Sequence, residues 1–240
     1  MRGTLDSIAT ALLVACALCV TALAVRREFF PSSRASNASN ADKPRYIASW
    51  RSFDSVGIVT GSSTAPVRIT EFVDYECPAC RAYSSVLSEI AQRHPDQVSE
   101  VFVHFPLQMH RFSQQAARAV ECATQQGRFQ AMRDRLFAQQ DSFGLKPWVA
   151  YAAAAGVSDS NRFASCLKDS ASVARIIRGS KLAETLDLNG TPTVIVNGWM
   201  YSTPPTLSEL EADASRIASG KPVFDSATLG KEERTALHKD

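Results

Sequence analysis

The chain has 240 residues, and its 26 Lys and Arg against 24 Asp and Glu leave a formal net charge of +2. That balance gives no reason to expect nucleic-acid binding through a basic surface. Apolar residues make up 45% of the chain and charged residues 21%, which is the composition of a globular protein and excludes a wholly disordered one. Six cysteines are too few for a small disulfide-built scaffold, so the position of each cysteine decides its use.

Residues 1–30 contain an apolar run without charge from Ile8 to Val25. About 17–25 apolar residues cross a bilayer, whereas the apolar core of a cleaved signal has about 7–15. The run therefore predicts an N-terminal membrane anchor, with a cleaved export signal or a lipoprotein lipidated at Cys16 as the alternatives. Arg26 and Arg27 follow the run, and the positive-inside rule favours the cytoplasmic side for that end of it, which conflicts with an exported domain. The orientation is therefore decided by the chemistry of the domain that follows.

Composition divides the rest of the chain into three segments. Residues 31–49 are rich in Ser, Asn and Ala, which predicts a flexible linker. Residues 50–218 carry regular apolar patterns and predict one folded domain. Residues 219–240 are polar and loosely patterned, which predicts a frayed C-terminal tail.

The folded segment opens with a strand, a helix and a second strand. Residues 67–75 are β-branched and aromatic and predict the first strand. Residues 78–94 repeat apolar side chains at helical spacing, and Pro78 stands in the first turn, where its missing N–H is not needed. Pro95 ends this helix. Residues 98–105 predict the second strand.

A block of helices follows, and a shorter strand pair closes the domain. The helical patterns cover residues 113–126, 128–140, 147–155, 160–168 and 172–188. Residues 193–196 predict a strand, Asn197-Gly198 a hairpin turn, and residues 206–219 a helix with a capping box of Thr206 and Glu209. The order is β-α-β, a helical insertion at about 107–188, then β-β-α. It predicts an α/β fold with a small central sheet covered by helices.

The strongest chemical signal is the motif Cys-Pro-Ala-Cys at residues 77–80, between a predicted strand and a predicted helix. Free N–H groups and the positive dipole end of a helix stabilise a thiolate there. We expect Cys77 to be the nucleophile of low pKa and Cys80 the thiol that resolves a mixed disulfide. A structural disulfide and half of a zinc site are the alternatives. Zinc needs two more ligands at close spacing, which neither Cys122 nor Cys166 supplies, so no metal site is predicted.

Three nearby features add weight to a motif that is only moderately specific alone. Glu71 lies on the incoming strand, where a buried carboxyl group would exchange a proton with the second cysteine; a solvated acid at a sheet edge is the alternative. Thr191-Pro192 precedes a strand, where a cis peptide is tolerated. Asp74 and Glu76 either raise the pKa of the first cysteine by repulsion or are simply solvated.

Several segments, in this order and spacing, resemble the DsbA-like thioredoxin-fold oxidoreductases. They are Phe72–Cys80, His104–Leu107, Glu121–Ala123 with Gln126–Phe129, and Gly190–Thr193 with Asn197-Gly198. The resemblance covers about residues 55–217. It implies a thioredoxin fold with an inserted helical domain, which the order of predicted elements suggests independently.

The resemblance also implies a role for each matching residue. It assigns Cys77 as nucleophile, Cys80 as resolving thiol and Glu71 as the buried acid of the family. The loop with a cis-proline faces the disulfide in that family, so we expect the substrate chain to meet these residues: Thr191, Pro192, Pro78 and Ala79.

Two departures from the family leave the direction of electron flow open. DsbA itself carries a histidine, which stabilises the thiolate, where this chain has Ala79. Thr191 before the proline also occurs in disulfide isomerases and reductases. An oxidase and a reductase or isomerase, for example one serving cytochrome maturation, are therefore both compatible with the motif.

Cys122 and Cys166 lie on apolar faces of two predicted helices in the insertion. They form either a structural disulfide or two buried free thiols, and an exported compartment favours the disulfide. The bridge would close a loop of about 45 residues. A loop of that length corresponds to a stabilisation of at most about 4 kcal/mol.

We therefore expect an exported thiol-disulfide oxidoreductase of a bacterial cell envelope, tethered to the inner membrane or secreted if its N-terminus is cleaved. Its expected substrates are cysteine-containing secreted or membrane proteins. The resemblance implies a membrane redox partner that recycles the cysteine pair. Because that pair is itself the electron carrier, no bound cofactor is expected. A non-catalytic thioredoxin-fold binding module is the alternative in another functional class, and a zinc-binding ectodomain is a third.

Overall fold

The computed structural model describes residues 44–224. The predicted anchor in residues 1–30, the linker up to residue 43 and the tail from residue 225 lie outside the described residues. Within the described part of the chain, every helix is too short or too polar to span a bilayer.

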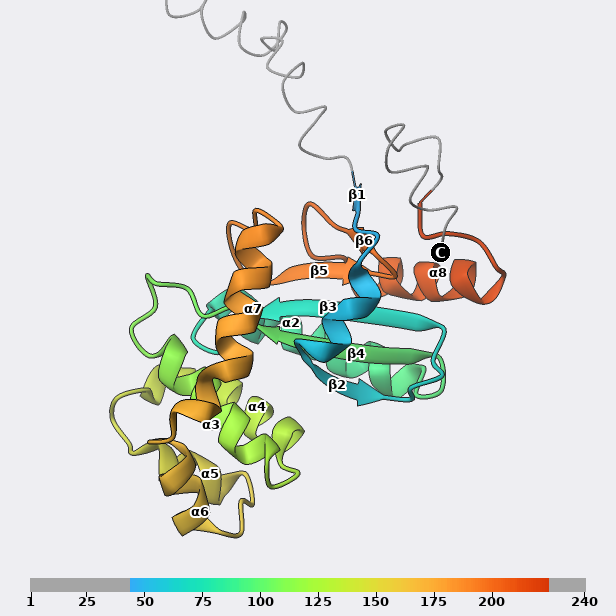
Figure 1. The fold of residues 1–240 in the computed structure, drawn as a ribbon. Coiled ribbons are helices and arrows are strands. Elements are labelled where there is room, and N and C mark those ends of the chain that lie inside the picture. The colour runs from blue at the N-terminus through green and yellow to red at the C-terminus, as the bar shows by residue number, and fades with distance from the viewer. Residues whose placement is uncertain (1–43, 225–240) are drawn as a thin grey trace, which may run out of the picture. The chain divides into compact units, whose positions relative to one another are not determined.

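The described strands form one mixed sheet in the order β1-β6-β5-β3-β4-β2. Their bounds are β1 Arg45–Tyr46, β2 Ile58–Gly61, β3 Val67–Val73, β4 Val98–His104, β5 Thr193–Val196 and β6 Trp199–Met200. β3 runs parallel to β4 and antiparallel to β5 in the middle of the sheet (Figure 1). All residues of β4 are buried, including the polar Ser99, Glu100 and His104.

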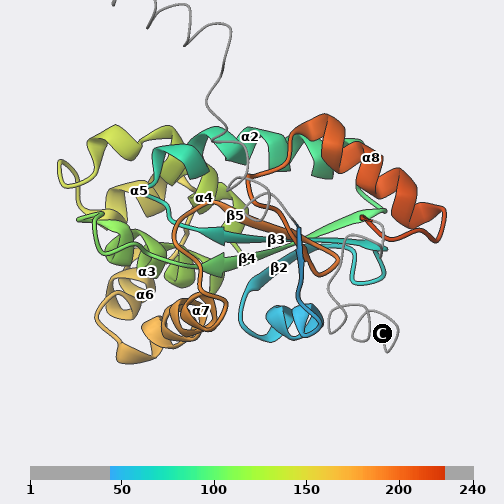
Figure 2. The ribbon, with the colours of Figure 1, turned by 90° about the horizontal axis from the view of Figure 1, so that it is seen from above.

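Helices cover both faces of this sheet and extend beyond one end of it. The α-helices are α2 Pro78–Arg93, α3 Ser113–Thr124, α4 Phe129–Ala138, α5 Trp148–Ala154, α6 Ser160–Cys166, α7 Ala174–Thr185 and α8 Leu207–Ala218. The 3-10 helices are η3 Trp50–Ser55, η4 Gln140–Ser142 and η5 Ser170–Val173. Figure 2 shows α2 and α8 on one face and η3 and α7 on the other.

Local sequence signals place several of the helix ends. α2 begins with Pro78 at its first turn and ends at Arg93, before Pro95. In α8 the Glu209 N–H donates to the Thr206 hydroxyl at 3.4 Å, and the Thr206 N–H donates to the Glu209 carboxylate at 2.7 Å. This reciprocal pair is the predicted capping box, and it is confirmed.

Two predicted segment boundaries are wrong. The flexible linker was expected to reach residue 49, yet Arg45 and Tyr46 pair with β6, and Ile47 is buried. The polar tail was expected from residue 219, yet Val223 is buried and the ring of Phe224 packs against the core. Both segments are too short to show an apolar period, so only their tertiary partners reveal them.

The predicted insertion at about 107–188 has two structurally different parts. Helices α3 to α6 pack on one another, and the Cys122–Cys166 disulfide joins α3 to α6 with a Cα–Cα distance of 5.7 Å. Helix α7 instead lies against the sheet. A Cβ atom on its Gly179 would stand 2.3 Å from the carbonyl oxygen of His104 in β4. Helix α7 therefore approaches β4 more closely than a side chain allows.

This approach predicts that Gly179→Ala lowers the free energy of unfolding by about 1–3 kcal/mol, because α7 or β4 must move to relieve the clash. Gly190→Ala is the control: a Cβ there meets nothing within 4 Å, so a change below about 0.5 kcal/mol is expected. Urea unfolding followed by circular dichroism measures both variants. Equal unfolding midpoints for the two would contradict the close approach.

The disulfide gives a second stability prediction. Replacing Cys122 and Cys166 together by Ala should lower the free energy of unfolding by up to about 4 kcal/mol, because the unfolded chain gains the freedom of the loop. Ser165→Ala, an exposed change on the same helix, is the control. The measurement is denaturant unfolding without reductant. A double variant as stable as the control would show that the bridge does not constrain the fold.

Candidate active site

Cys77 occupies the N-cap of α2, directly after the loop that follows β3. Its extended backbone, with φ −73° and ψ 122°, turns the chain from the sheet into the helix. Pro78 follows as the first helical residue, and Pro78 and Ala79 are exposed. The Cys77 thiol donates to the carbonyl oxygen of Thr191 at 3.3 Å. The motif thus stands where a strand, a helix and a distant loop meet.

This position makes Cys77 acidic. Hydrogen bonding by the Cys80 thiol lowers the pKa of Cys77 most, and the Thr191 side chain and the backbone N–H groups of Ala79 and Cys80 act in the same direction. Burial opposes them, and the pKa falls to about 5. Donors that stabilise the charged form account for the shift. Cys77 is therefore a thiolate at neutral pH.

Cys80 has the opposite character. It lies one helical turn inward and has no exposed surface. Burial raises its pKa most strongly, and the neighbouring Cys77 and Glu71 raise it further. Cys80 is therefore a neutral thiol beside a thiolate. The two sulfur atoms are both free in this structure and differ in reactivity.

The loop before β5 brings the predicted substrate residues to the cysteines. The Thr191–Pro192 peptide is cis, and both residues are partly exposed. The hydroxyl oxygen of Thr191 is buried and has no hydrogen-bond partner within residues 44–224. Its proximity to Cys77 still lowers the pKa of that thiol.

Glu71 is buried in the central strand β3, with 2% of its surface exposed. The alternative of a solvated acid at a sheet edge is therefore wrong. Burial raises its pKa, Arg133 lowers it, and Glu100 and Cys77 raise it further, to about 8. Glu71 in turn raises the pKa of Cys80. A carboxyl group that keeps its proton near neutral pH thus lies within electrostatic reach of Cys80.

The two acids before Cys77 are not solvated charges. Asp74 is buried, and its carboxylate accepts from the Leu107 N–H at 2.8 Å and contacts His110 Nδ1 at 2.7 Å. Glu76 accepts from the backbone N–H of Phe112. Both acids therefore hold the 105–112 loop beside the motif. The alternative that both acids are simply solvated is therefore wrong.

Other residues of the site were missed from sequence. Although burial lowers the pKa of His110, its hydrogen bond to Asp74 and the negative charge of Cys77 raise it overall. Gln140 donates to the carbonyls of Tyr75 and Cys77, each at 2.9 Å. No local pattern links these residues to residues 77–80. His110 and Gln140 reach the motif only through the tertiary fold.

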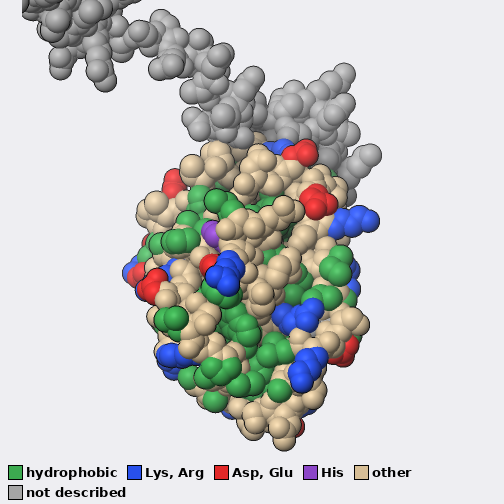
Figure 3. All heavy atoms as spheres, turned by 90° about the vertical axis from the view of Figure 1, so that its left-hand side faces the viewer, with side chains coloured by type: hydrophobic (Ala, Val, Ile, Leu, Met, Phe, Trp, Pro, Cys, Tyr) green, Lys and Arg blue, Asp and Glu red, His purple; other side chains and the backbone are tan. Residues whose placement is uncertain are grey.

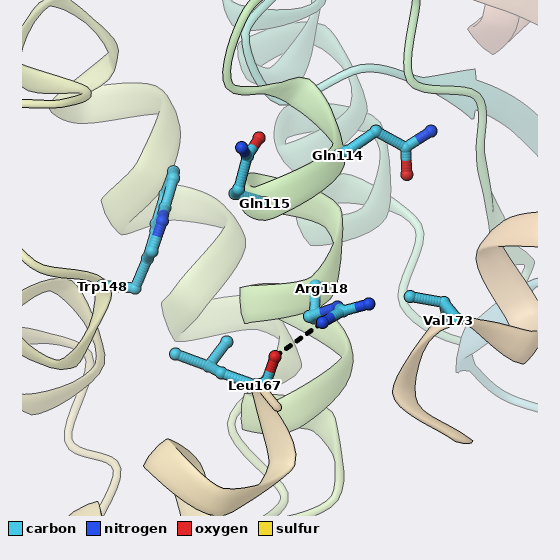
Figure 4. A pocket seen from close by; sticks show the side chains of 6 residues that line it. All are labelled: Gln114, Gln115, Arg118, Trp148, Leu167 and Val173. Atoms are coloured by element: carbon cyan, nitrogen blue, oxygen red, sulfur yellow. Dashed lines mark hydrogen bonds between the residues drawn. The ribbon is translucent and has the colours of Figure 1, made fainter. Parts of the chain in front are cut away.

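The insertion also holds a pocket of about 320 Å³ between α3, α5, α6 and η5 (Figure 4). Its lining residues are Gln114, Gln115, Arg118, Trp148, Leu167 and Val173. Arg118 spans it and donates to the Leu167 carbonyl at 2.6 Å. None of the cysteine-site residues lines this pocket. Within residues 44–224 no group of three or more His, Cys, Asp and Glu could hold a metal ion.

The proteins that this chain resembles include thioredoxin-like and DsbA proteins. A family model described as thioredoxin matches residues 54–213. DsbA2 of Pseudomonas aeruginosa is 30% identical over 65% of this chain and 91% of its own, with a TM-score of 0.52. A thioredoxin-like oxidoreductase from Silicibacter pomeroyi DSS-3 is 26% identical over 70% and 95% of the two chains, with a TM-score of 0.59.

A different class of protein contains a related segment. The Na(+)/H(+) antiporter NhaA 1 of Mycobacterium sp. (strain KMS) is 37% identical over 149 residues. The match takes in 61% of this chain but only 24% of the antiporter. The match therefore covers about a quarter of the length of these curated relatives.

The family match covers most of the described residues, and DsbA2 is similar over nearly its whole length. The cysteine motif lies at the N-terminus of α2, opposite the Thr191–Pro192 loop. The chain belongs to the thioredoxin family, among its DsbA-like thiol-disulfide oxidoreductases.

Proposed function

We propose that this protein is a protein disulfide oxidoreductase whose redox centre is the Cys77–Cys80 pair. The observation that carries the proposal is the contrast between the two sulfurs: Cys77 is an ionised thiolate at a helix N-terminus, and Cys80 is a buried neutral thiol. Thiol-disulfide exchange needs one sulfur that attacks and leaves readily and a second one that closes the ring.

The reaction proceeds by two exchanges. A substrate thiolate attacks Cys77 Sγ of the oxidised pair, the Cys77–Cys80 bond breaks, and Cys80 leaves as a thiolate that takes up one proton. A second substrate thiolate then attacks the substrate sulfur of the mixed disulfide and releases Cys77 as a thiolate. The substrate loses two electrons, and the protein gains them. The reverse sequence reduces a substrate disulfide.

Glu71 supplies the proton that Cys80 takes up. Its carboxyl group is buried, carries a pKa of about 8, and lies within electrostatic reach of Cys80. A buried acid with a pKa near the working pH is suited to proton transfer in either direction. Without such a donor, an uncompensated thiolate at Cys80 would be buried in apolar surroundings.

The substrate is a polypeptide that approaches Cys77 along the exposed edge of the motif. Pro78 and Ala79 are exposed, and the Thr191–Pro192 loop borders the sulfur on the other side. Met109, in the neighbouring 105–112 loop, is 83% exposed. A mobile thioether adapts to varied apolar side chains. Figure 3 shows further hydrophobic side chains spread over the insertion side of the molecule, between scattered charges.

We place the domain outside the cytoplasm of a bacterium, held by the apolar N-terminal run or released if that run is cleaved. The Cys122–Cys166 disulfide supports an oxidising compartment. A periplasmic thioredoxin-like protein from Salmonella enterica serovar Typhimurium shares the fold. The reduced pair must be reoxidised after each turnover, so a membrane redox partner is part of the proposal. No bound cofactor is needed, because the cysteines carry the electrons.

A reductase or isomerase is the second candidate, and one observation favours it. Ala79 stands beside Cys77 in place of a histidine that would stabilise the thiolate. Weaker stabilisation of the reduced form gives a more reducing potential. Equilibration with a glutathione series decides between the candidates: a potential near that of thioredoxin supports the reductase, and a markedly more oxidising one supports the oxidase.

The order of attack predicts different outcomes for the two cysteines. With a peptide that carries a disulfide, Cys77→Ser should abolish reduction of the peptide, because no thiolate remains to attack its disulfide. Cys80→Ser should trap a mixed disulfide: Cys77 attacks the peptide disulfide and releases one peptide thiolate, and the resolving thiol is gone. Non-reducing electrophoresis with the peptide measures both. Ser165→Ala, far from the motif in sequence and exposed, is the control. Unchanged turnover in Cys77→Ser would reject the assignment.

The acidity of Cys77 predicts its pH profile. Alkylation of reduced protein by iodoacetamide should stay fast down to about pH 5 and slow below it, because Cys77 is ionised above that pH. An ordinary thiol slows below about pH 8.5. Cys77 in urea-unfolded protein is the control and should show the ordinary profile. The same midpoint in folded and unfolded protein would refute an activated thiolate.

The same shift links redox state to stability. Because the folded-state pKa lies below the unfolded value, ionised Cys77 stabilises the reduced fold fully above about pH 8.5. That contribution disappears as the pH falls towards about 5. Between about pH 8.5 and about pH 5, the free energy of unfolding of the reduced wild-type protein should therefore fall relative to that of reduced Cys77→Ala.

A further inference from the structure

A second buried acid lies beside Glu71. Glu100 of β4 is 6% exposed, and its Cα pairs with Ile69, two residues before Glu71 in β3. Phe102 pairs with Glu71 itself. Paired residues of neighbouring strands share a face, and so do residues two apart in one strand. Glu71, Glu100 and Phe102 therefore point to the same face of the sheet, the face that α2 covers.

Arg133 of α4 is the positively charged residue next to Glu71, Glu100 and Phe102. It is 1% exposed, and its guanidinium lies 4.8 Å from the centre of the Phe102 ring. Its Nη2 donates to the Ser88 hydroxyl of α2 at 3.0 Å, and its Nε donates to Asp134 at 3.1 Å. Arg133 lowers the pKa of both Glu71 and Glu100. This cation from the helical insertion, which forms an ion pair with Asp134, thus also acts through space on two carboxyl groups of the sheet.

The hydrogen bonds of this cluster are incomplete. Glu71 Oε1, Glu100 Oε1 and Arg133 Nη1 are all buried, and none has a hydrogen-bond partner within residues 44–224. Two buried carboxylates beside a single guanidinium would leave one negative charge uncompensated, which is costly in a low dielectric. Burial raises the pKa of Glu71 to about 8 and that of Glu100 to about 7, in agreement with a shared proton.

Glu100 also connects the cluster to the surface. β4 lies between β3 and β2, and the Glu100 carboxylate accepts from the Thr60 hydroxyl of β2 at 3.2 Å. Thr60 is partly exposed near the edge of the sheet. A proton lost from the cluster can therefore be replaced from the Glu100 side, away from the cysteines.

We propose that Glu71, Glu100 and Arg133 form one proton-holding unit beneath the cysteine pair: Arg133 compensates one carboxylate, and the other carboxyl group keeps the proton that Cys80 takes when the disulfide opens. The inference rests on the proposed function. Glu100 and Arg133 act through Glu71 and are positioning residues. In the exchange, the S–S bond breaks, the Cys80 thiolate becomes a thiol, and the unit gains one negative charge until solvent returns the proton.

Other titratable groups face the unit and belong to its electrostatics. They are Tyr75 and Cys77 before α2, Cys80 and Tyr83 in α2, and Asp134 of α4. Both tyrosines have raised pKa values because they are buried, so they stay neutral at physiological pH. The changes in charge that matter are thus those of the two cysteines and the two glutamates.

The test uses two substitutions with opposite expected effects. Glu100→Gln removes a negative charge, so the titration midpoint of Glu71 should fall by about one pH unit. Arg133→Met removes the positive charge, so the midpoint should rise by about one unit. Carboxyl-carbon NMR of the reduced chain measures both. Arg133→Lys keeps the positive charge and should return the midpoint towards that of the wild type. If Arg133→Met does not fold, the shift in Glu100→Gln still tests the unit.

The same variants should shift the exchange reaction. The rate of disulfide opening by dithiothreitol, divided by the concentration of its thiolate, should fall above the midpoint of the unit. At alkaline pH, Glu100→Gln should therefore be about tenfold slower than wild type and Arg133→Met about tenfold faster, since one pH unit is a factor of ten in protonation. Damage to the fold would slow both variants alike.

Asp213→Asn is the matched control, since Asp213 is a buried acid whose pKa burial raises to about 6 but which bonds to Tyr201 outside the unit. It should leave both midpoints in place. Unshifted midpoints in Glu100→Gln and Arg133→Met, or shifts in the same direction for these two variants, would overturn the unit. Wild-type protein that does not react with dithiothreitol would instead overturn the proposed function, and the NMR midpoints would still decide on the unit.

Discussion

The chemistry depends on the contact between the first turn of α2 and the Thr191–Pro192 loop. Cys77 caps the helix, receives hydrogen bonds from its neighbours in that turn and lies 3.3 Å from the Thr191 carbonyl. The Cys80 thiol, the Thr191 side chain and the backbone N–H groups of Ala79 and Cys80 outweigh the cost of burial and leave the sulfur ionised. The same arrangement buries Cys80 one turn deeper, where charge is unfavourable. One helix end thus produces two sulfurs of opposite character.

The helical insertion contributes directly to this site. Gln140 holds the carbonyls on both sides of Glu76, and Arg133 reaches the sheet to face Glu71. The 105–112 loop, at the entry to the insertion, is tied to Asp74 and Glu76. A change in packing between insertion and sheet would therefore reach the cysteines. The disulfide between α3 and α6 stiffens the insertion that carries these contacts.

Buried charge in the sheet gives the cysteine pair a source of protons. A disulfide that opens inside a protein creates a thiolate away from water, and such a charge must be neutralised nearby. Glu71 and Glu100 are buried carboxyl groups, and Arg133 compensates only one of them. The cost of burying these groups is then part of the function, because it keeps a proton available beneath Cys80.

The sequence by itself determined the motif, the order of the main strands and helices, and the capping of α8. These depend on residues that are neighbours along the chain, such as residues 77–80 or Thr206 and Glu209. The short strands β1 and β2 and the buried Val223 escaped prediction, because segments of two to four residues carry too few positions to show a period. Only the tertiary structure decided that Asp74 is buried, that His110 and Gln140 join the site, and that Arg133 faces Glu71 and Glu100. Arg133 did leave a signal, a charge four residues after Phe129 on an apolar helix face, but its partners lie on strands far away in sequence. Burial and charge compensation depend on those partners, and no local pattern contains them.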